Sequence, residues 1–259
     1  MIKLSVNLNK IAVIRNSRGG EIPSVMQAAR TCIAAGCHGI TVHPRPDARH
    51  ITRRDVLDLS ALLTHEYKRI EFNIEGFPGP DFLDLVCEVQ PKQCTLVPDP
   101  PDVLTSNAGW TLDSNAEWLA AILERLRRNG IRSSLFIEPD IKAVDAAKAL
   151  GADRVELFTG PYAKAFPTTF SEHILHAHRE AARHARAIGV GVNAGHDLDL
   201  DNLPAYVEEV KGLQETSIGH ALISDALYIG LARAVKEYLK ALGSAPMIAI
   251  PRRRSSSRR

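Results

Sequence analysis

Side chains that can move protons lie within, at the end of or just after several short apolar runs along this chain. The residues in question are His43, Glu75, Glu156, His196 and His220. Carboxylates and imidazoles can both be tuned toward neutral pH, so a group of them suits general acid–base chemistry. One such residue alone is more often a hydrogen-bonded loop residue. Their recurrence after successive runs predicts a shared site.

Two glycine-containing segments point to phosphate binding. Residues 193–197 read NAGHD and residues 218–220 read IGH. Glycine lets backbone N–H groups approach an anion closely, although either segment alone would more simply be a turn. Arg15 and Arg18, in the segment RNSRGG, could add cationic donors. We therefore expect anionic, phosphorylated small-molecule ligands.

The elements that must position these residues are eight short runs rich in β-branched and apolar residues. They span Lys3–Asn7, Gly39–His43, Ile70–Glu75, Gln93–Val97, Arg132–Ile137, Arg154–Phe158, Gly191–Ala194 and Glu215–Gly219. Their length and composition suit buried parallel strands.

Helical patterns separate the runs. Apolar residues repeat at helical spacing in residues 25–32 and 118–126. Capping boxes are expected at Ser114 with Glu117 and at Thr169 with Glu172. Four glycines between a helical pattern and the next run suit the position just after a helix. These glycines are Gly36, Gly130, Gly151 and Gly189.

Strands that alternate with helices predict right-handed βαβ units and a parallel sheet. Eight units in about 240 residues match the size of a (β/α)8 TIM barrel. A doubly wound open sheet is the alternative, but no nucleotide-binding glycine fingerprint follows the first run. The barrel would gather the strand-end residues at one mouth. We expect one barrel domain, residues 1–243, and a basic, disordered tail, residues 244–259.

Composition excludes several classes of protein. The 259 residues carry 32 Lys and Arg against 30 Asp and Glu, and five of the Arg lie in the last nine residues. At 45% hydrophobic and 24% charged, the chain is globular rather than disordered. It has no apolar run near the ~18 residues of a membrane helix. Its start lacks a signal peptide, and its four cysteines form no CxxC, so we expect a cytoplasmic protein with reduced thiols.

Seven segments together resemble the pyridoxine 5′-phosphate synthase family. In chain order they are VNLNKIAVIRNSRGG, GITVHPRPDARHI, FNIEG, CTLVP, RVELFTGPYA, VNAGHDL and SIGHALISDAL. The resemblance covers nearly the whole chain. It implies a (β/α)8 barrel with extra helices, a homo-oligomer that is an octamer built from dimers, and no metal or organic cofactor. It also implies a transferase that condenses 3-amino-2-oxopropyl phosphate with 1-deoxy-D-xylulose 5-phosphate to give pyridoxine 5′-phosphate, phosphate and water.

The resemblance also implies a role for each matching residue. Proton transfer falls to His43, Glu75 and His196, and stabilisation of the transition state falls to Glu156. The aminoketone phosphate would be bound by Asn7, Arg18, Asp197, Gly219 and His220. The deoxyxylulose phosphate would be bound by Asn9, Lys10, Arg45, His50 and Thr105.

Two sites and one segment depart from the common pattern of that family. Many members have Asp-His where this chain has Asn9-Lys10, and many have Gly where it has Asp197. The segment after Thr105 reads SNAGW in place of an acidic, glycine-containing one. Lys10 supplies a fixed positive charge where a histidine could shuttle a proton.

Other readings remain open. Residues 98–114 form a candidate lid, or simply a static loop. Another phosphosugar barrel, an isomerase or lyase, is an alternative, although a Schiff-base aldolase would need a lysine where Glu156 stands. His176 and His178 suggest a metallohydrolase, but residues at i and i+2 do not share a helix face. The basic tail suggests a binding protein for nucleic acid or membrane surfaces, yet no aromatic residues are interleaved with its arginines, so we expect neither partner.

Overall fold

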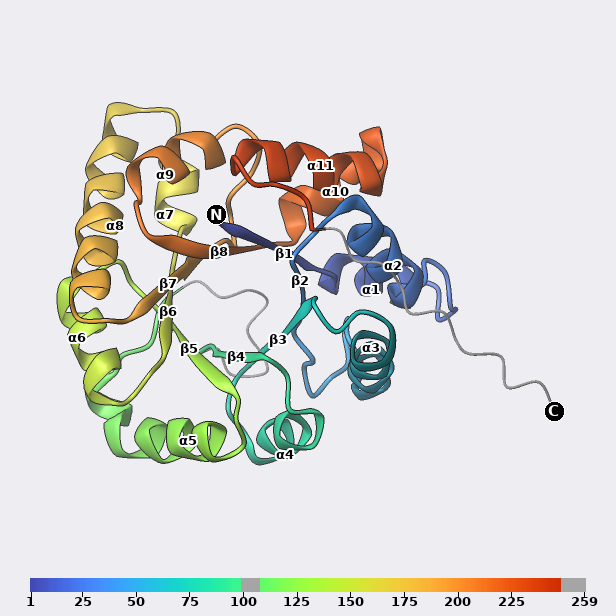
Figure 1. Ribbon diagram of the computed structural model, residues 1–259, viewed down its shortest axis with the longest axis horizontal. Helices are drawn as coiled ribbons and strands as arrows, with labels where there is room; N and C mark the ends of the chain where they lie inside the picture. The colour runs from blue at the N-terminus through green and yellow to red at the C-terminus, as the bar shows by residue number, and fades with distance from the viewer. Residues whose placement is uncertain (99–107, 248–259) are drawn as a thin grey trace.

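Eight parallel strands close into a barrel in the computed structural model, which describes residues 1–98 and 108–247 (Figure 1). The strands are β1 Lys3–Asn7, β2 Gly39–Val42, β3 Glu71–Gly76, β4 Gln93–Leu96, β5 Arg132–Ile137, β6 Arg154–Leu157, β7 Gly191–Ala194 and β8 Leu213–Ile218. Each pairs with the next, and β8 pairs with β1. The predicted TIM barrel is confirmed, and the open doubly wound sheet is wrong.

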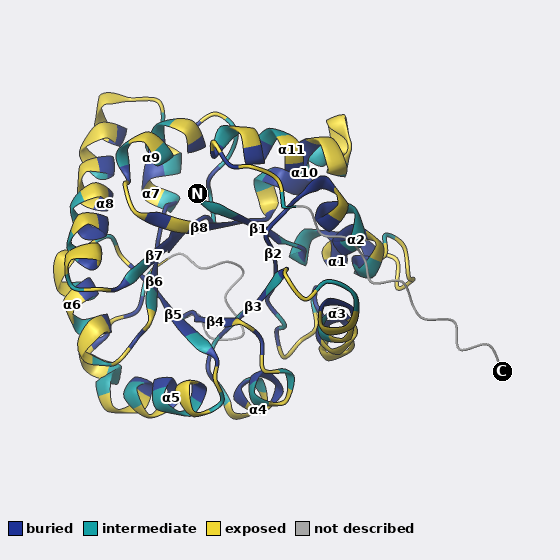
Figure 2. Ribbon diagram, viewed as in Figure 1, coloured by how far each residue is buried: buried dark blue, intermediate teal, exposed yellow. Residues whose placement is uncertain are grey.

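Helices surround the barrel (Figure 1). They are α1 Asn9–Asn16, α2 Val25–Ala35, α3 Arg53–Glu66, α4 Pro80–Val89, α5 Ala116–Arg128, α6 Ile141–Ala149, α7 Gly160–Ala165, α8 Thr169–Ala187, α9 Leu203–Glu209, α10 His220–Ile229 and α11 Leu231–Ala241, with a short 3-10 turn at Asp113–Asn115. Two helices follow each of β1, β6 and β8, so the expected extra helices are present. Figure 2 shows the outer faces of the helices exposed and the barrel-facing sides buried.

Local signals set the helix ends, with two corrections. Gly36 and Gly151 adopt φ of 105° and 90° just after α2 and α6, as expected for residues that end helices. The α8 cap is Thr168 rather than Thr169, because the Thr168 side chain accepts a hydrogen bond from Ser171 N. The expected cap at Ser114 is wrong, since α5 begins at Ala116 with no side-chain cap. A spacing pattern locates a helix start only to within a residue or two.

The apolar core lies between the barrel and its helices. Leu4, Val6, Ile40 and Val42, on the outer face of β1 and β2, are fully buried there. The alternate residues face the barrel interior, and almost all of them are polar. They are Lys3, Ser5, Asn7, Thr41, Glu71, Asn73, Glu75, Gln93, Thr95, Arg132, Ser134, Arg154, Glu156, Asn193, Glu215 and Ser217. Barrel interiors more commonly hold Val, Ile and Leu.

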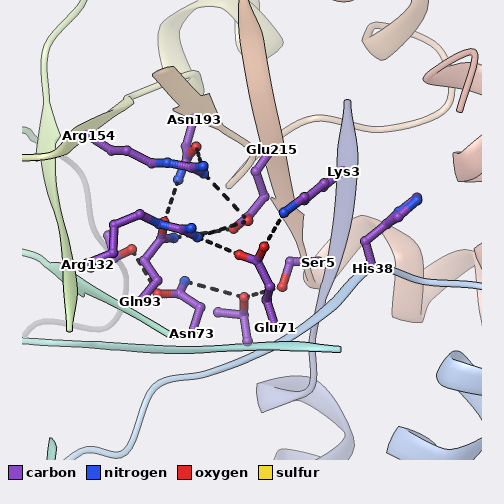
Figure 3. A network of polar contacts seen from close by, with 12 residues as sticks. Lys3, Ser5, His38, Glu71, Asn73, Gln93, Arg132, Arg154, Asn193 and Glu215 are labelled. Atoms are coloured by element: carbon purple, nitrogen blue, oxygen red, sulfur yellow. Dashed lines mark hydrogen bonds and ion pairs between the residues drawn. The ribbon is translucent and has the colours of Figure 1, made fainter. Parts of the chain in front are cut away.

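Charged groups at the N-terminal ends of the strands are joined in what we call the inner polar network (Figure 3). It comprises Lys3, Glu71, Gln93, Arg132, Arg154, Asn193 and Glu215. Glu71 accepts from Lys3 and, at 2.6 Å, from Arg132, whose Nε donates to Gln93 at 2.9 Å. Pairing of this kind makes buried charge tolerable.

The chain segment after α11 returns to the barrel. Ser244 Oγ donates to Ile2 O, and Met247 N donates to Gly36 O at 2.8 Å. The first residues of the expected tail therefore contact the folded domain. Residues 248–259, which contain all the arginines of the expected tail, lie outside the described residues. Within residues 1–98 and 108–247, no helix is long and apolar enough to cross a membrane.

Candidate active site

A pocket of about 290 Å³ opens at the C-terminal ends of the strands. Its lining consists of Asn7, Asn9, Lys10, His43, Arg45, His50, Glu75, Thr95, Val97, Phe136, Glu156, His196, Asp197, Ser217, Gly219 and His220. Every residue to which the family resemblance gives a catalytic or binding role is among them except Arg18 and Thr105. The closed barrel thus brings together residues that lie more than 200 positions apart in the chain.

The two exceptions have different reasons, and a third expectation fails. Arg18 is exposed in the turn after α1, and Thr105 lies outside the described residues. Arg15, expected to donate to phosphate, is buried and bonded to both carboxylate oxygens of Asp55, at 2.5 and 2.9 Å. It also donates to His50 O at 3.3 Å. Arg15 therefore holds the loop that carries His50 instead of facing the pocket.

Glu75 lies near the end of β3 with neutral donors on both carboxylate oxygens. Asn7 Nδ2 donates to Oε2 at 3.2 Å, and Ser217 Oγ donates to Oε1 at 3.3 Å. Burial raises the pKa of Glu75 to about 7, although His196 and the Ser217 hydrogen bond act to lower it. A carboxyl with this pKa is divided between its acid and base forms near pH 7, as a proton-transfer group should be.

Glu156, on β6, is the second carboxyl of the pocket. It is 4% exposed, and its Oε2 has no hydrogen-bond partner among the described residues. Burial raises its pKa well above the ordinary value, and the negative charges of Glu75 and Glu215 raise it further. The raised pKa favours the protonated form of Glu156, which can donate a hydrogen bond.

Two histidines on the β2–α3 side of the pocket are held neutral. Burial lowers the pKa of His43 well below its usual range, and the Arg45 charge adds to this. Burial and Arg45 likewise lower the pKa of His50 to about 4. Backbone bonds position both residues, because His43 N donates to Asn9 Oδ1 at 2.9 Å and His50 Nδ1 accepts from Ile51 N at 2.9 Å. A neutral imidazole has one ring nitrogen that can accept a proton.

His196 follows β7 and faces the same pocket. Its Nδ1 lies 2.8 Å from Asp197 Oδ2. Its ring meets Phe136 edge to face, with centroids 6.4 Å apart. Phe136, from β5, packs in turn against Phe158 from the β6 side. The pocket wall near His196 is thus partly apolar, which strengthens electrostatic interactions inside it.

Two helix N-termini bring partial positive charge to the pocket. Asn9 and Lys10 begin α1, and His220 begins α10 directly after Gly219. A Cβ on Gly219 would lie 3.0 Å from the Cβ of Asn7, so glycine allows the close approach of these two strands' ends. Unpaired N–H groups and the helix dipole favour anions at both places. The pocket therefore offers two positions for anionic groups.

Sequence reasoning missed four lining residues. They are Thr95, Val97, Phe136 and Ser217. Ser217 was within reach, because period-two alternation from Gly219 places it on the inner face of β8. Phe136 gave no such signal, since an aromatic residue in a strand is usually a core residue.

The expected lid, residues 98–114, is described only in part, because residues 99–107 lie outside the described residues. Its final segment is tied to the barrel. Trp110 donates from its backbone N to Phe136 O and from its ring Nε1 to Leu96 O, both at 2.9 Å. Lid closure stays a prediction.

The histidines that suggested a metallohydrolase point to separate partners. His178 is buried with Nδ1 2.9 Å from the Tyr206 hydroxyl, and His176 Nδ1 lies 2.6 Å from an Arg179 nitrogen. Among the described residues, no group of three His, Cys, Asp or Glu side chains is arranged to hold a metal ion. This helix surface gives no support to the metallohydrolase alternative.

Comparisons with known proteins agree with this geometry. Residues 4–244 match the family described as pyridoxal phosphate biosynthesis protein PdxJ. A pyridoxine 5′-phosphate synthase of Bacteroides thetaiotaomicron is 52% identical over 242 residues, which cover 93% of this chain and all of the relative. One of Brucella abortus is also 52% identical over 242 residues, with 93% and 98% covered.

A solved structure of phosphoribosyl anthranilate isomerase from Thermotoga maritima shares the fold. It has a TM-score of 0.58 at 11% identity and covers 94% of this chain and 99% of the isomerase. At that identity the likeness concerns the barrel alone. The family match and the two synthase relatives extend over nearly all of the chain. The chain therefore belongs to the PdxJ family of pyridoxal phosphate biosynthesis proteins.

Proposed function

We propose that this chain is a pyridoxine 5′-phosphate synthase. It condenses 3-amino-2-oxopropyl phosphate with 1-deoxy-D-xylulose 5-phosphate and releases pyridoxine 5′-phosphate, inorganic phosphate and water. The observation that carries the proposal is the pocket itself, in which Glu75, with a pKa of about 7, shares a lining with Glu156, His43 and His196. The identity to synthases over more than 90% of the chain supports the same assignment.

The reaction needs proton transfers at carbon, nitrogen and oxygen. Glu75, partly ionised near pH 7, is the base for enolisation and dehydration. His43, held neutral, serves the ketone oxygen during imine formation and elimination. His196 serves the later proton transfers and the departing phosphate. Glu156, whose raised pKa favours its protonated form, donates a hydrogen bond to negative charge that develops in the transition state.

Two phosphorylated substrates require two anion positions. We assign the aminoketone phosphate to the α10 end of the pocket, where Gly219 and His220 lie, and deoxyxylulose phosphate to the α1 end, where Asn9 and Lys10 lie. Arg45 and His50 line the α1 side as well, together on the β2–α3 loop. We propose no metal or organic cofactor. Arg18 lies outside the pocket lining, and we give it no role in this arrangement.

We also propose a homo-oligomer, an octamer built from dimers, that works in the cytoplasm. Exposed apolar side chains on neighbouring elements support an interface between copies. Ile14 on α1 is 41% exposed, and Leu227 and Tyr228 on α10, which packs against α1, are 70% and 88% exposed. Exposed apolar groups gathered on adjoining helices mark association surfaces. Light scattering would give the mass of the assembly directly, and Tyr228→Asp should weaken it.

The decisive experiment incubates the purified protein with both substrates. Pyridoxine 5′-phosphate and inorganic phosphate should appear together in equal amounts. Each substrate alone is the control. Consumption of deoxyxylulose phosphate without the aminoketone would favour the isomerase or lyase alternative. Absence of both products with an intact, folded protein would exclude the synthase.

A further inference from the structure

Asp197 is an acidic side chain in a pocket proposed to hold two phosphates. Its carboxylate lines the pocket and lies 2.8 Å from His196 Nδ1. Its backbone N–H donates to Thr159 Oγ1 at 3.4 Å. Both polar groups of Asp197 that could reach a ligand in this region therefore have partners within the protein.

This arrangement does not suit direct phosphate binding. A carboxylate is an acceptor only, and it carries the same sign of charge as a phosphate. The backbone N–H, which could donate to a phosphate, is directed to Thr159. The remaining polar contact of the side chain is the short one between the carboxylate and the imidazole, in which Nδ1–H is the natural donor.

We propose that Asp197 is a positioning residue that fixes the orientation and the tautomer of His196. With Nδ1–H donated to Asp197, Nε2 is the nitrogen that exchanges protons with the reacting molecules. When His196 is protonated, the carboxylate also stabilises the imidazolium. This inference rests on the proposed function for the proton-transfer role of His196, but the His196–Asp197 contact does not.

The surroundings of the pair fit this role. Gly160 begins α7 beside it, and a Cβ at that position would lie 2.6 Å from the Phe158 ring and 3.1 Å from Asp197 Oδ2. Glycine therefore leaves room for the carboxylate. The Phe136 ring contacts His196, and the charge of His196 acts on the titratable groups Glu75 and His43. Asp197 thus places a negative charge beside Nδ1 of His196.

Two variants of Asp197 and one control separate its effect on the orientation of His196 from the effect of its negative charge. Asp197→Asn keeps an acceptor for Nδ1–H without the charge, and Asp197→Ala removes both. Asp201→Asn is the matched control, because Asp201 is an exposed acid of the same loop whose side chain has no described contact with His196. Thermal unfolding of all three should match the native chain, since the Asp197 side chain is 39% exposed.

Steady-state kinetics with both substrates should show a change in kcat without a matching change in KM. We expect Asp197→Ala to lower kcat about tenfold, less than the 10²–10⁴ of a proton-transfer group itself. Asp197→Asn should fall between it and the native chain, and KM for the aminoketone phosphate should stay within about twofold. Asp201→Asn should change none of these quantities.

A readout without turnover distinguishes this inference from the proposed function. In [15N]histidine-labelled protein, the His196 resonances, identified with His196→Gln, should show the Nδ1–H tautomer, which Asp197→Ala should lose. An unchanged tautomer in Asp197→Ala would overturn the inference even if the synthase reaction is demonstrated. A raised KM for the aminoketone phosphate at normal kcat would also overturn it, because Asp197 would then bind the substrate amine. A protein that makes no pyridoxine 5′-phosphate but shows the tautomer change would refute the function alone.

Discussion

Two glutamates on the inner face of β3 behave in opposite ways. Glu71 and Glu75 are four residues apart on one strand. Burial by itself would raise the pKa of Glu71, but hydrogen bonds from Lys3 and Arg132 lower it to about 2. Burial raises the pKa of Glu75 to about 7, because its donors, Asn7 and Ser217, are neutral. The residue type and the strand are the same, and only the partners differ.

The difference divides the barrel interior into two regions. At the N-terminal ends of the strands, the inner polar network sets cations against its carboxylates (Figure 3). At the C-terminal ends, Glu75 and Glu156 face each other's charge without a described ion pair to a lysine or arginine. In this fold, residues at the N-terminal ends of the strands usually stabilise the barrel, and residues at the C-terminal ends carry out the chemistry. Pairing separates Glu71 from Glu75, whereas burial raises the pKa of Glu215 even though Arg154 and Arg132 act to lower it.

The variant with the largest expected effect tests the region at the C-terminal ends of the strands. Glu75→Gln should lower kcat by roughly 10²–10⁴, because the amide cannot accept the proton that the reaction transfers. Binding of pyridoxine 5′-phosphate, measured by equilibrium titration, should stay within a few-fold of the native value. Near-normal turnover in this variant would remove Glu75 from its assigned role.

A second variant tests the inner polar network. Arg132→Met should destabilise the fold by about 3 kcal/mol, because it leaves the carboxylates of Glu71 and Glu215 with fewer cations in a buried place. Urea unfolding at pH 7 would measure the loss. Turnover per folded molecule should change little. A fully stable Arg132→Met protein would show that the network is not needed to balance Glu71.

The two glutamates should also give opposite dependences of stability on pH. The lowered pKa of Glu71 means that its ionised form stabilises the fold, and that this is lost as pH falls from 4.5 toward 2. The raised pKa of Glu75 means that ionisation destabilises the fold as pH rises from 4.5 to 7. As the pH falls, the free energy of unfolding of the native chain should therefore decrease relative to that of Glu71→Gln, by up to about 3 kcal/mol.

Relative to that of Glu75→Gln, the free energy of unfolding of the native chain should instead decrease as the pH rises toward 7. Unfolding midpoints of the native chain and both variants, recorded from pH 2 to pH 8, would check both signs together. Parallel curves for the two variants would contradict the contrast between the two regions.

The smallest expected effect concerns Ser217. Its hydroxyl holds the pKa of Glu75 lower than burial alone would allow. Ser217→Ala should therefore move the acid limb of the kcat/KM profile to higher pH, with a loss of about fivefold at pH 7 from one hydrogen bond. Ser217→Thr, which keeps the hydroxyl, is the matched control. An unshifted limb in the alanine variant would mean that Ser217 does not act on Glu75.

Much of the site could be predicted because the barrel has simple rules. The eight runs matched the strands to within two residues at each end. Polar residues at the ends of parallel strands must meet at one mouth once the sheet closes. That reasoning alone placed His43, Glu75 and His196 together, and the resemblance to a known family supplied their roles.

Side-chain pairing was harder to predict. Arg15 was expected at the mouth, but it bonds Asp55, a partner 40 residues away on a different helix. Glu71 and Glu75 look alike in the sequence, and nothing in it shows which of them Lys3 and Arg132 approach. Such contacts depend on the stagger of strands around the barrel, which shifts facing residues in a way that local patterns do not record.

The sequence by itself determined the alternation of strands and helices, the closed barrel and the family, because hydrophobic period and motif order are written along the chain. Only the tertiary structure decided which acids are paired with cations and which have a raised pKa. A pKa depends on burial and on charges within a few ångströms, and these neighbours come from strands that are distant in sequence. The contact of Asp197 with His196 joins adjacent residues, yet its meaning also depends on the pocket that the barrel builds around them.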